Sequence, residues 1–253
     1  MGAEHGAEPV PGAGEPHHTL GLEVMSDAIR YRRYLIELLQ PHIGRTILEV
    51  GSGLGDLAAG LGGYARLIVT DVDPACLSEL ADRFGTRADV DVMRMDLRED
   101  DATTPSVDTV LAVNVLEHIV DDAGALRRMA ASVVPGGNIV LFVPAYPSLY
   151  GPHDRAAGHV RRYVPKTLRA AVVKAGLRVE VLRPVNFLGG IAWWVAVRVG
   201  GCSSPRSSLV GLYDRLVVPV VRFMETRWRP PFGQSILCVA RVPETPEDAS
   251  TDR

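Results

Sequence analysis

This sequence has few cysteines, no long apolar run and no excess of basic residues, and each of these features argues against a class of protein. The three cysteines, Cys76, Cys202 and Cys238, are too few and too scattered for a disulfide framework or for paired zinc ligands. The longest apolar run, residues 187–197, is about half the roughly 20 residues that a membrane-spanning helix requires. The formal net charge is −3, so the basic surface that nucleic acid needs is not expected.

The two ends of the chain are predicted to be tails outside a single globular domain. Residues 1–18 consist mainly of Gly, Ala, Pro, Glu and His, a composition with little to bury on folding. Residues 243–253 have a similar composition, and residues 19–242 are expected to form one domain. No basic segment followed by an apolar stretch opens the sequence, so we expect no secretion signal and, by default, a cytoplasmic location.

Between these tails, apolar strand-like segments alternate with segments of helical pattern. Strands are expected over residues 46–50, 65–70, 90–95, 109–113, 138–143, 178–182 and 235–241. Helices are expected over residues 26–39 with Ser26 as N-cap, from Asp56 onward, and over 74–84, 166–175 and 209–227. This alternation favours a doubly wound α/β fold whose seven-stranded sheet is parallel except for one strand near the C-terminus. Residues 187–231, before the last strand, are expected to form a helical cap insertion.

A glycine-rich turn after the first strand is the strongest chemical signal in the sequence. The segment Glu49-Val50-Gly51-Ser52-Gly53-Leu54-Gly55 places three glycines directly after that strand. Glycines let the backbone approach a ligand and direct amide N–H groups toward it. The Gly-x-Gly-x-Gly spacing differs from the Gly-x-Gly-x-x-Gly of dinucleotide-binding domains. A carboxylate at Glu49 would oppose a pyrophosphate, but it suits a cationic amino-acid ligand.

Together with the segments after the next strands, this turn resembles the class I methyltransferase family over about residues 25–186 plus the last strand. Asp71 resembles the family acid that binds both ribose hydroxyls, and Asp96-Leu97 resembles the position that contacts the adenine amino group. The segment Asn114-Val115-Leu116-Glu117-His118 is similar to the one that borders the methionine end of the cofactor. The resemblance implies S-adenosylmethionine as cofactor, with S-adenosylhomocysteine as product. The cofactor-binding residues that it implies are Glu49, Gly51, Ser52, Gly53, Gly55, Asp71, Val72, Asp96, Leu97, Asn114 and Val115.

Several residues of these segments have structural alternatives. Asp73 beside Asp71 is expected only to cap the following helix, and Asp96 has the alternative of a solvated loop acid. The Asn114-x-x-Glu117 spacing predicts a capping box, in which Asn114 caps a helix and Glu117 reaches back. His118 either faces the site or packs structurally.

The segment after the fifth strand, residues 146–163, is rich in side chains suited to an acceptor. Its pattern Asp154-Arg155…Gly158-His159…Arg161-Arg162-Tyr163 resembles a bacterial subgroup of these enzymes presumed to methylate glycans, lipids or secondary metabolites. A neutral imidazole can take a proton from a hydroxyl or amine, so the expected catalytic residues are His118, His153 and His159. The expected acceptor-binding residues are Tyr31, Tyr146, Tyr150, Arg155, Arg162, Tyr163, Asn186 and Trp193.

The same segment also has a purely structural interpretation. Pairs between Asp154 and the neighbouring arginines would then simply fasten the loop. No metal is expected, because His153, Asp154 and His159 lack the spacing typical of a ligand pair.

The sequence therefore predicts a methyltransferase acting on a small molecule, at O, N or C, in secondary metabolism. The alternatives are a membrane-associated enzyme acting on a lipid, quinone or glycan precursor, a non-catalytic S-adenosylmethionine-binding protein, and a nicotinamide-dependent oxidoreductase. The cap has a different role in each case. It would be a lid or a wall of the acceptor pocket, a patch on a membrane surface, or an element that packs against the sheet or against a second copy in a homodimer. Neither nucleic acid nor a membrane is expected as the main partner.

Overall fold

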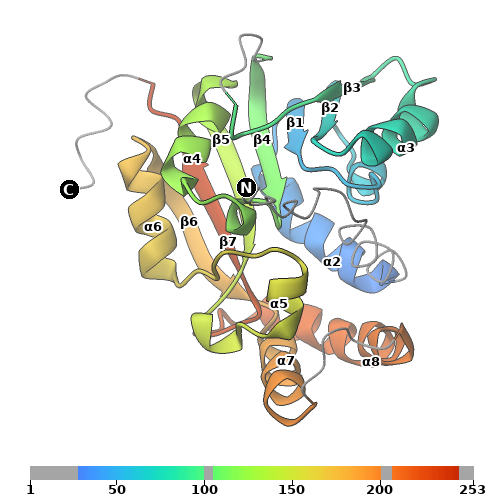
Figure 1. The fold of residues 1–253 in the computed structure, drawn as a ribbon, viewed down its shortest axis with the longest axis vertical. Coiled ribbons are helices and arrows are strands. Elements are labelled where there is room, and N and C mark those ends of the chain that lie inside the picture. The colour runs from blue at the N-terminus through green and yellow to red at the C-terminus, as the bar shows by residue number, and fades with distance from the viewer. Residues whose placement is uncertain (1–27, 100–104, 201–206, 245–253) are drawn as a thin grey trace, which may run out of the picture.

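The computed structural model describes residues 28–99, 105–200 and 207–244, and places a twisted sheet at the centre of the molecule (Figure 1). Its strands are β1 Thr46–Val50, β2 Arg66–Asp71, β3 Val90–Arg94, β4 Val107–Val113, β5 Val133–Pro144, β6 Arg178–Val185 and β7 Ser235–Arg241. Their order in the sheet is β3-β2-β1-β4-β5-β7-β6. β7 is antiparallel to both of its neighbours, and the other pairs are parallel. The predicted seven-stranded sheet with one antiparallel strand is confirmed.

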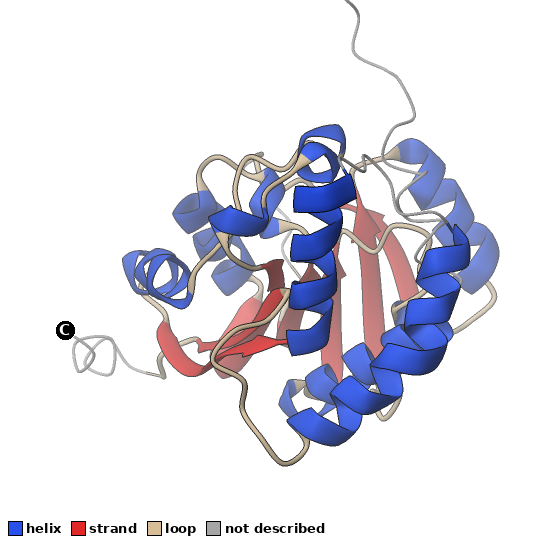
Figure 2. Ribbon diagram, turned by 90° about the horizontal axis from the view of Figure 1, so that it is seen from below, coloured by secondary structure: helices blue, strands red, loops and turns tan. Residues whose placement is uncertain are grey.

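Helices cover both faces of this sheet (Figure 2). They are α2 Ile29–Leu39, α3 Pro74–Phe84, α4 Asp122–Ala131, α5 Pro152–Ala156, α6 Pro165–Lys174, α7 Phe187–Gly200 and α8 Ser207–Glu225. Leu39 of α2 and Phe84 of α3 pack with Ile47 on one face, whereas Met129 of α4 packs with Leu48 on the other. Neighbouring strand residues thus point to opposite faces, and apolar side chains are needed on both.

The segment after β1 contradicts the expectation of a helix from Asp56. Only a short 3-10 turn, Ala58–Gly60, forms there. Gly60, Gly62 and Gly63 fall within the expected helix, and each makes a helix less favourable by about 1 kcal/mol relative to alanine. The chain therefore passes from the glycine turn to β2 without an α-helix.

The expected N-cap and tails fall mostly outside the described residues. The first described helix begins at Ile29 with Ala28 at its N-cap position, whereas Ser26 lies in the range that is not described. The same holds for residues 1–18 and for 245–253, so the tail boundaries stay predictions.

α7 and α8 form the described part of the cap between β6 and β7 and lie together at one end of the molecule (Figure 1). Tyr34 of α2 packs against Val221 of α8. The carboxylate of Asp214 in α8 accepts hydrogen bonds from the backbone N–H groups of Arg30 (3.1 Å) and Tyr31 (2.7 Å) in the first turn of α2. The cap is thus fastened to the helix that precedes the first strand. Among the described helices, none is both long and apolar enough to cross a membrane.

Candidate active site

Three glycines at the carboxyl end of β1 form the tight turn expected there. Gly51, Gly53 and Gly55 have φ angles of 67°, 55° and 76°, which glycine adopts without strain. A Cβ atom on Gly51 would lie only 2.7 Å from Cγ2 of Val115 in the loop after β4. Glycine is therefore needed for the backbone angle and also for the close approach of the β1 and β4 ends.

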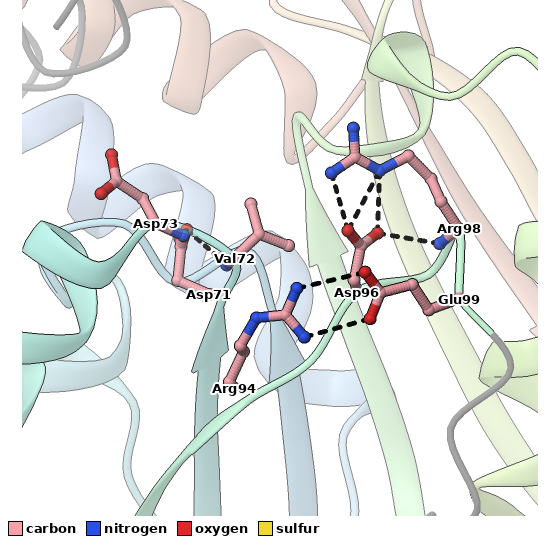
Figure 3. Close-up of polar contacts among 7 residues, drawn as sticks. All are labelled: Asp71, Val72, Asp73, Arg94, Asp96, Arg98 and Glu99. Atoms are coloured by element: carbon pink, nitrogen blue, oxygen red, sulfur yellow. Dashed lines mark hydrogen bonds and ion pairs between the residues drawn. The ribbon is translucent and has the colours of Figure 1, made fainter. Parts of the chain in front are cut away.

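Asp71 at the end of β2 is held in one orientation by backbone amides. Its carboxylate accepts hydrogen bonds from the N–H groups of Gly53 (2.9 Å), Val72 (2.8 Å) and Asp73 (3.0 Å). Figure 3 shows this strand end, where Asp73 points away from Asp71. Asp73 instead caps α3 by accepting from the N–H of Ala75 (2.8 Å), which confirms the structural role predicted for it.

Glu49 is a carboxylate buried beside the glycine turn. It is 3% exposed, and its Oε2 atom has no hydrogen-bond partner among the described residues. Burial raises the pKa of the Glu49 carboxyl to about 7, although a hydrogen bond with Ser52 acts in the opposite direction. A cationic group brought to Oε2 would satisfy this oxygen, which is the chemistry that the amino group of S-adenosylmethionine offers.

Asp96 and Leu97 follow β3 and are both buried. The Asp96 carboxylate accepts hydrogen bonds from the backbone N–H (2.9 Å), Nε (2.9 Å) and Nη2 (2.7 Å) of Arg98 (Figure 3). These bonds lower the pKa of Asp96. The side chain of Arg98 is 67% exposed, so it is free to swing into solvent. Contact between Asp96 and an adenine amino group requires Arg98 to share the carboxylate or to leave it.

The turn after β4 shows that the predicted capping box is wrong. Asn114 has a φ of 54°, and the 3-10 turn Leu116–His118 that follows has no side-chain cap. Glu117 is fully buried, and neither of its carboxyl oxygens has a hydrogen-bond partner among the described residues. Burial raises its pKa to about 8. Asparagine tolerates the left-handed conformation, and the resulting turn directs Glu117 inward instead of back toward position 114.

The three histidines predicted as catalytic lie together. The ring centroid of His159 is 4.7 Å from that of His118 and 6.5 Å from that of His153, edge to face in both pairs. Nδ1 of His159 lies 2.8 Å from Oδ1 of Asp154, and its Nε2 lies 3.9 Å from Oε1 of Glu117. His118 follows β4 whereas the other two follow β5, so the pairing of these strands brings them together. We call these five residues the histidine cluster.

Asp154 is the anionic centre of the histidine cluster. Besides His159, its carboxylate contacts Nε of Arg162 (2.7 Å) and the backbone N–H of Gly151 (2.8 Å). Burial acts to raise the pKa of Asp154, but the bonds from His159 and Arg162 outweigh it and hold the pKa at about 2. Arg162 is itself buried, so its guanidinium fastens the loop in the way that the structural alternative describes.

Three of the four tyrosines predicted to bind the acceptor use their hydroxyls in hydrogen bonds within the protein. Tyr163 is 1% exposed, whereas Tyr146 and Tyr150 are partly exposed. Their bonds run from Tyr146 to the Pro231 carbonyl (3.1 Å), from Tyr150 to the His159 carbonyl (2.8 Å) and from Tyr163 to the Asp122 carboxylate (3.1 Å). An acceptor would therefore meet the rings of Tyr146 and Tyr150 more readily than it would meet Tyr163.

Trp193 and Arg155 occupy different positions around the same loop. The indole Nε1 of Trp193 donates to the Leu149 carbonyl (3.0 Å), and its ring lies 5.3 Å from that of His153. Its ring also lies beneath the guanidinium carbon of Arg162 at 5.4 Å. Arg155 is exposed. Trp193 thus connects α7 to the histidine cluster, and Arg155 faces solvent.

Tyr31 and Asn186 belong to a separate set of contacts between α2, the cap and β7. The Asn186 side chain donates to Gln234 (2.8 Å) and accepts from the Tyr213 hydroxyl (2.6 Å). Burial raises the pKa of Tyr31 to about 12, although hydrogen bonds with Ser235 and Asn186 act to lower it. The polar atoms of Asn186 are therefore occupied by the fold.

Glu117 and Arg98 are the residues whose place in the site was not predicted. Glu117 was expected only to cap a helix, although an acid directly before His118 in a turn after a parallel strand is a signal for this position. Arg98 has no comparable signal, because its pairing with Asp96 depends on the local course of the chain after β3.

Comparison with known families agrees with this arrangement. A family model described as a methyltransferase domain matches residues 48–139, the range that holds the glycine turn, Asp71, Asp96 and the turn after β4. An uncharacterised methyltransferase of Mycobacterium leprae is 28% identical over 194 residues, which cover 72% of this chain and 69% of the relative.

Solved structures show the same fold. The putative methyltransferase of Haloferax volcanii, solved in complex with the Trm112 methyltransferase activator, aligns with a TM-score of 0.62 at 18% identity over 92% of this chain and 100% of its own. The trans-methyltransferase CalH, solved with S-adenosylhomocysteine, aligns with a TM-score of 0.51 at 17% identity over 87% of this chain and 58% of its own. Residues 48–139 therefore carry a methyltransferase domain, and the chain has the fold of these solved methyltransferases.

Proposed function

We propose that this enzyme transfers the methyl group of S-adenosylmethionine to a small-molecule acceptor held against the histidine cluster. The observation that carries the proposal is the convergence of His118, His153 and His159 from two different loops, beside buried carboxylates. The cofactor supplies an electrophilic methyl group, and its transfer demands mainly alignment of the acceptor and exclusion of water. A histidine cluster suits an acceptor that must also lose a proton.

Three carboxylates are assigned to the polar parts of the cofactor. Glu49, Asp71 and Asp96 stand at the carboxyl ends of β1, β2 and β3, which are neighbours in the sheet. Ligands of doubly wound sheets bind at this edge. We assign the amino group to Glu49, the ribose hydroxyls to Asp71 and the adenine amino group to Asp96 with Leu97. The supporting observations are the unpartnered oxygen of Glu49 and the amide-fixed orientation of Asp71.

Within the histidine cluster, we assign proton removal from the acceptor to His153. His159 is held by Asp154, and its side chain is only 11% exposed. His153 is also partly exposed, and its ring lies edge to face with that of Trp193. An imidazole titrates near neutral pH, so it can accept a proton from a hydroxyl or amine as the methyl group transfers.

An apolar hollow beside the same loop would take the non-reacting part of the acceptor. Its volume is about 310 Å³. Pro147–Leu149 and α7 border it, and the lining residues are Ser148, Leu149, Ile191, Trp194 and Phe232. Because most of this lining is apolar, it favours an acceptor with an apolar portion.

Transfer of label from methyl-labelled S-adenosylmethionine tests this proposal. The enzyme would be added to an extract of source cells, which is then divided into polar, lipid and macromolecular fractions. We expect label in the polar small-molecule fraction, and secondary metabolites of that fraction are the acceptors that we predict. His153→Ala should keep the cofactor affinity of the parent enzyme and slow turnover about 100-fold or more. Label only in macromolecules would overturn the small-molecule assignment.

An acceptor at a membrane surface is a second candidate, favoured by the outer face of α8. Leu212, Leu216, Val220 and Phe223 follow one another at helical spacing and are each 47–62% exposed. Arg215, Arg222 and Arg227 lie nearby and are also exposed. An apolar stripe flanked by arginines is the pattern of a helix that lies on an anionic membrane.

Vesicle co-sedimentation distinguishes the two candidates. Vesicles of a zwitterionic lipid with and without an anionic lipid would be mixed with the parent chain, with Leu216→Glu and with Val173→Glu. Val173 is exposed on α6, away from the cap, and therefore serves as the matched control. Binding that requires anionic lipid, weakens in salt and is lost only in Leu216→Glu would support a membrane acceptor. Equal recovery of all three chains in the supernatant would exclude an acceptor at a membrane surface.

A further inference from the structure

Inside the histidine cluster, a ring nitrogen of His159 and a carboxyl oxygen of Glu117 face one another at a distance too long for a hydrogen bond. Nδ1 of His159 is 2.8 Å from a carboxylate oxygen of Asp154, a geometry that favours the tautomer in which Nδ1 carries the proton and Nε2 is available as a ligand. Nε2 lies 3.9 Å from Oε1 of Glu117. Both oxygens of Glu117 are buried and have no hydrogen-bond partner among the described residues. A buried carboxyl group that faces an imidazole nitrogen offers a place where a metal cation can replace the carboxyl proton.

We propose that Glu117, His118 and His159 bind one divalent transition-metal ion. The three residues can each offer one ligand atom, and these atoms lie within 4.8 Å of one another. Two imidazoles and one carboxylate form a set that zinc, cobalt, nickel and ferrous ions accept, whereas magnesium and calcium prefer oxygen alone. The sequence by itself favoured no metal, because these ligands come from two separate loops.

Small movements would bring the three ligand atoms to bonding distance. Ligand atoms about 2.0–2.2 Å from one ion lie roughly 3–4.4 Å from each other, so the 4.8 Å spread must shrink by about 1 Å. His118 can supply this movement, because its ring is partly exposed and stands in a short 3-10 turn. Glu117 and His159 are more firmly enclosed and define the position of the ion.

The surroundings of His159 match those of a metal-ligating histidine. Such histidines usually donate their second ring N–H to a carboxylate, which fixes the tautomer and the ring orientation. Asp154 has this role here, and Arg162 and Gly151 hold Asp154 in turn. An ion bound by three protein ligands keeps open positions, where an acceptor oxygen could bind and lose its proton more easily. This last role rests on the proposed function, whereas binding of the ion does not.

Metal titration of the whole chain without cofactor or acceptor tests the site. The protein, free of any affinity tag, would be stripped with a chelator and titrated with Co²⁺ by visible absorption and with Zn²⁺ by calorimetry. We expect one ion per chain at the site, with an affinity that falls at least 100-fold in Glu117→Gln and in His159→Ala. Asp154→Asn should weaken binding about 10- to 100-fold. His153→Ala, a histidine of the same loop outside the ligand set, should bind as the parent does.

The test is the difference in metal binding between the parent and Glu117→Gln. His5, His17 and His18 are present in both chains, so any metal that they bind adds the same background to both titrations. Equal titration curves for these two chains would overturn the site, as would the absence of stoichiometric binding in the parent. If Glu117→Gln does not fold, His118→Ala gives the same test at a partly exposed position. Metal binding with no label transfer would contradict the proposed function but leave this site in place.

Discussion

At the scale of single residues, the carboxylates that end the first three strands differ in how completely the protein satisfies them. Asp71 accepts three backbone hydrogen bonds, and Asp96 is paired with Arg98. Glu49 retains a buried oxygen without a partner. Asp71 is therefore held in one orientation, Asp96 is available to a ligand only if Arg98 shares its carboxylate or leaves it, and Glu49 gains most from a cationic ligand.

The first prediction contrasts Asp71 with its near neighbour Asp73. Asp71→Ala should abolish measurable binding of S-adenosylmethionine in a calorimetric titration, since it removes the ribose acceptor and releases the Gly53 amide. Asp73→Ala removes only the cap of α3 and should lower the free energy of unfolding by about 1 kcal/mol with unchanged cofactor affinity. Unchanged affinity in Asp71→Ala would refute the ribose assignment.

The second prediction concerns the buried pair between Arg162 and Asp154. Arg162→Ala leaves Asp154 buried without its cation, so the free energy of unfolding should fall by about 3–5 kcal/mol. Arg155→Ala changes an exposed arginine and should stay within about 0.5 kcal/mol of the parent. Urea denaturation of the parent, Arg162→Ala and Arg155→Ala measures the two changes in the free energy of unfolding. Similar midpoints for the two variants would contradict the structural role of Arg162.

At the scale of elements, the cap is attached to the molecule chiefly through α2. Asp214 accepts from two amides in the first turn of α2, and Glu225 accepts from the Tyr34 hydroxyl (2.5 Å). Arg222 forms an ion pair with Glu37 at 2.6 Å. α8 therefore completes the N-terminus of a helix that lies far away in the sequence.

A third prediction follows for Asp214. Asp214→Ala should lower the free energy of unfolding by about 1–2 kcal/mol, the usual effect of removing a helix cap. It should also speed the exchange of backbone amide hydrogens in the first turn of α2. Arg215→Ala, at the exposed neighbouring position, is the control and should leave that exchange unchanged. Protection of α2 that is equal in the two variants would show that Asp214 does not cap this helix.

At the scale of the whole molecule, stability should depend on pH through the buried carboxyl of Glu49. Its folded-state pKa of about 7 lies above its ordinary value of 4.5, so the folded protein holds this proton longer than the unfolded chain does. The stabilisation that comes from this bound proton is fully present below about pH 4.5. It is lost as the pH rises through 7, which lowers the free energy of unfolding by about 3 kcal/mol.

The fourth prediction is therefore a comparison of Glu49→Gln with the parent in the absence of cofactor. Between pH 5 and pH 8 the free energy of unfolding of the parent should fall relative to that of the variant, because glutamine does not ionise. Denaturant titrations at a series of pH values measure this difference. A constant difference across that range would mean that Glu49 titrates normally.

The sequence by itself determined the sheet and the edge on which the cofactor residues stand. Apolar segments of strand length and the glycine turn are local patterns, and parallel strands carry their carboxyl ends to one edge whatever their contacts. Glu49, Asp71 and Asp96 could be assigned to that edge for this reason.

Only the tertiary structure decided which side chains meet. The local spacing predicted that Glu117 caps a helix. The turn at Asn114 instead buries Glu117, which faces His159 of the next loop. Likewise, the sequence offered Arg162 both as an acceptor ligand and as a partner of Asp154, and the structure shows the pairing with Asp154. Pairings of this kind depend on how separate loops pack above the sheet, and no periodicity within one segment carries that information.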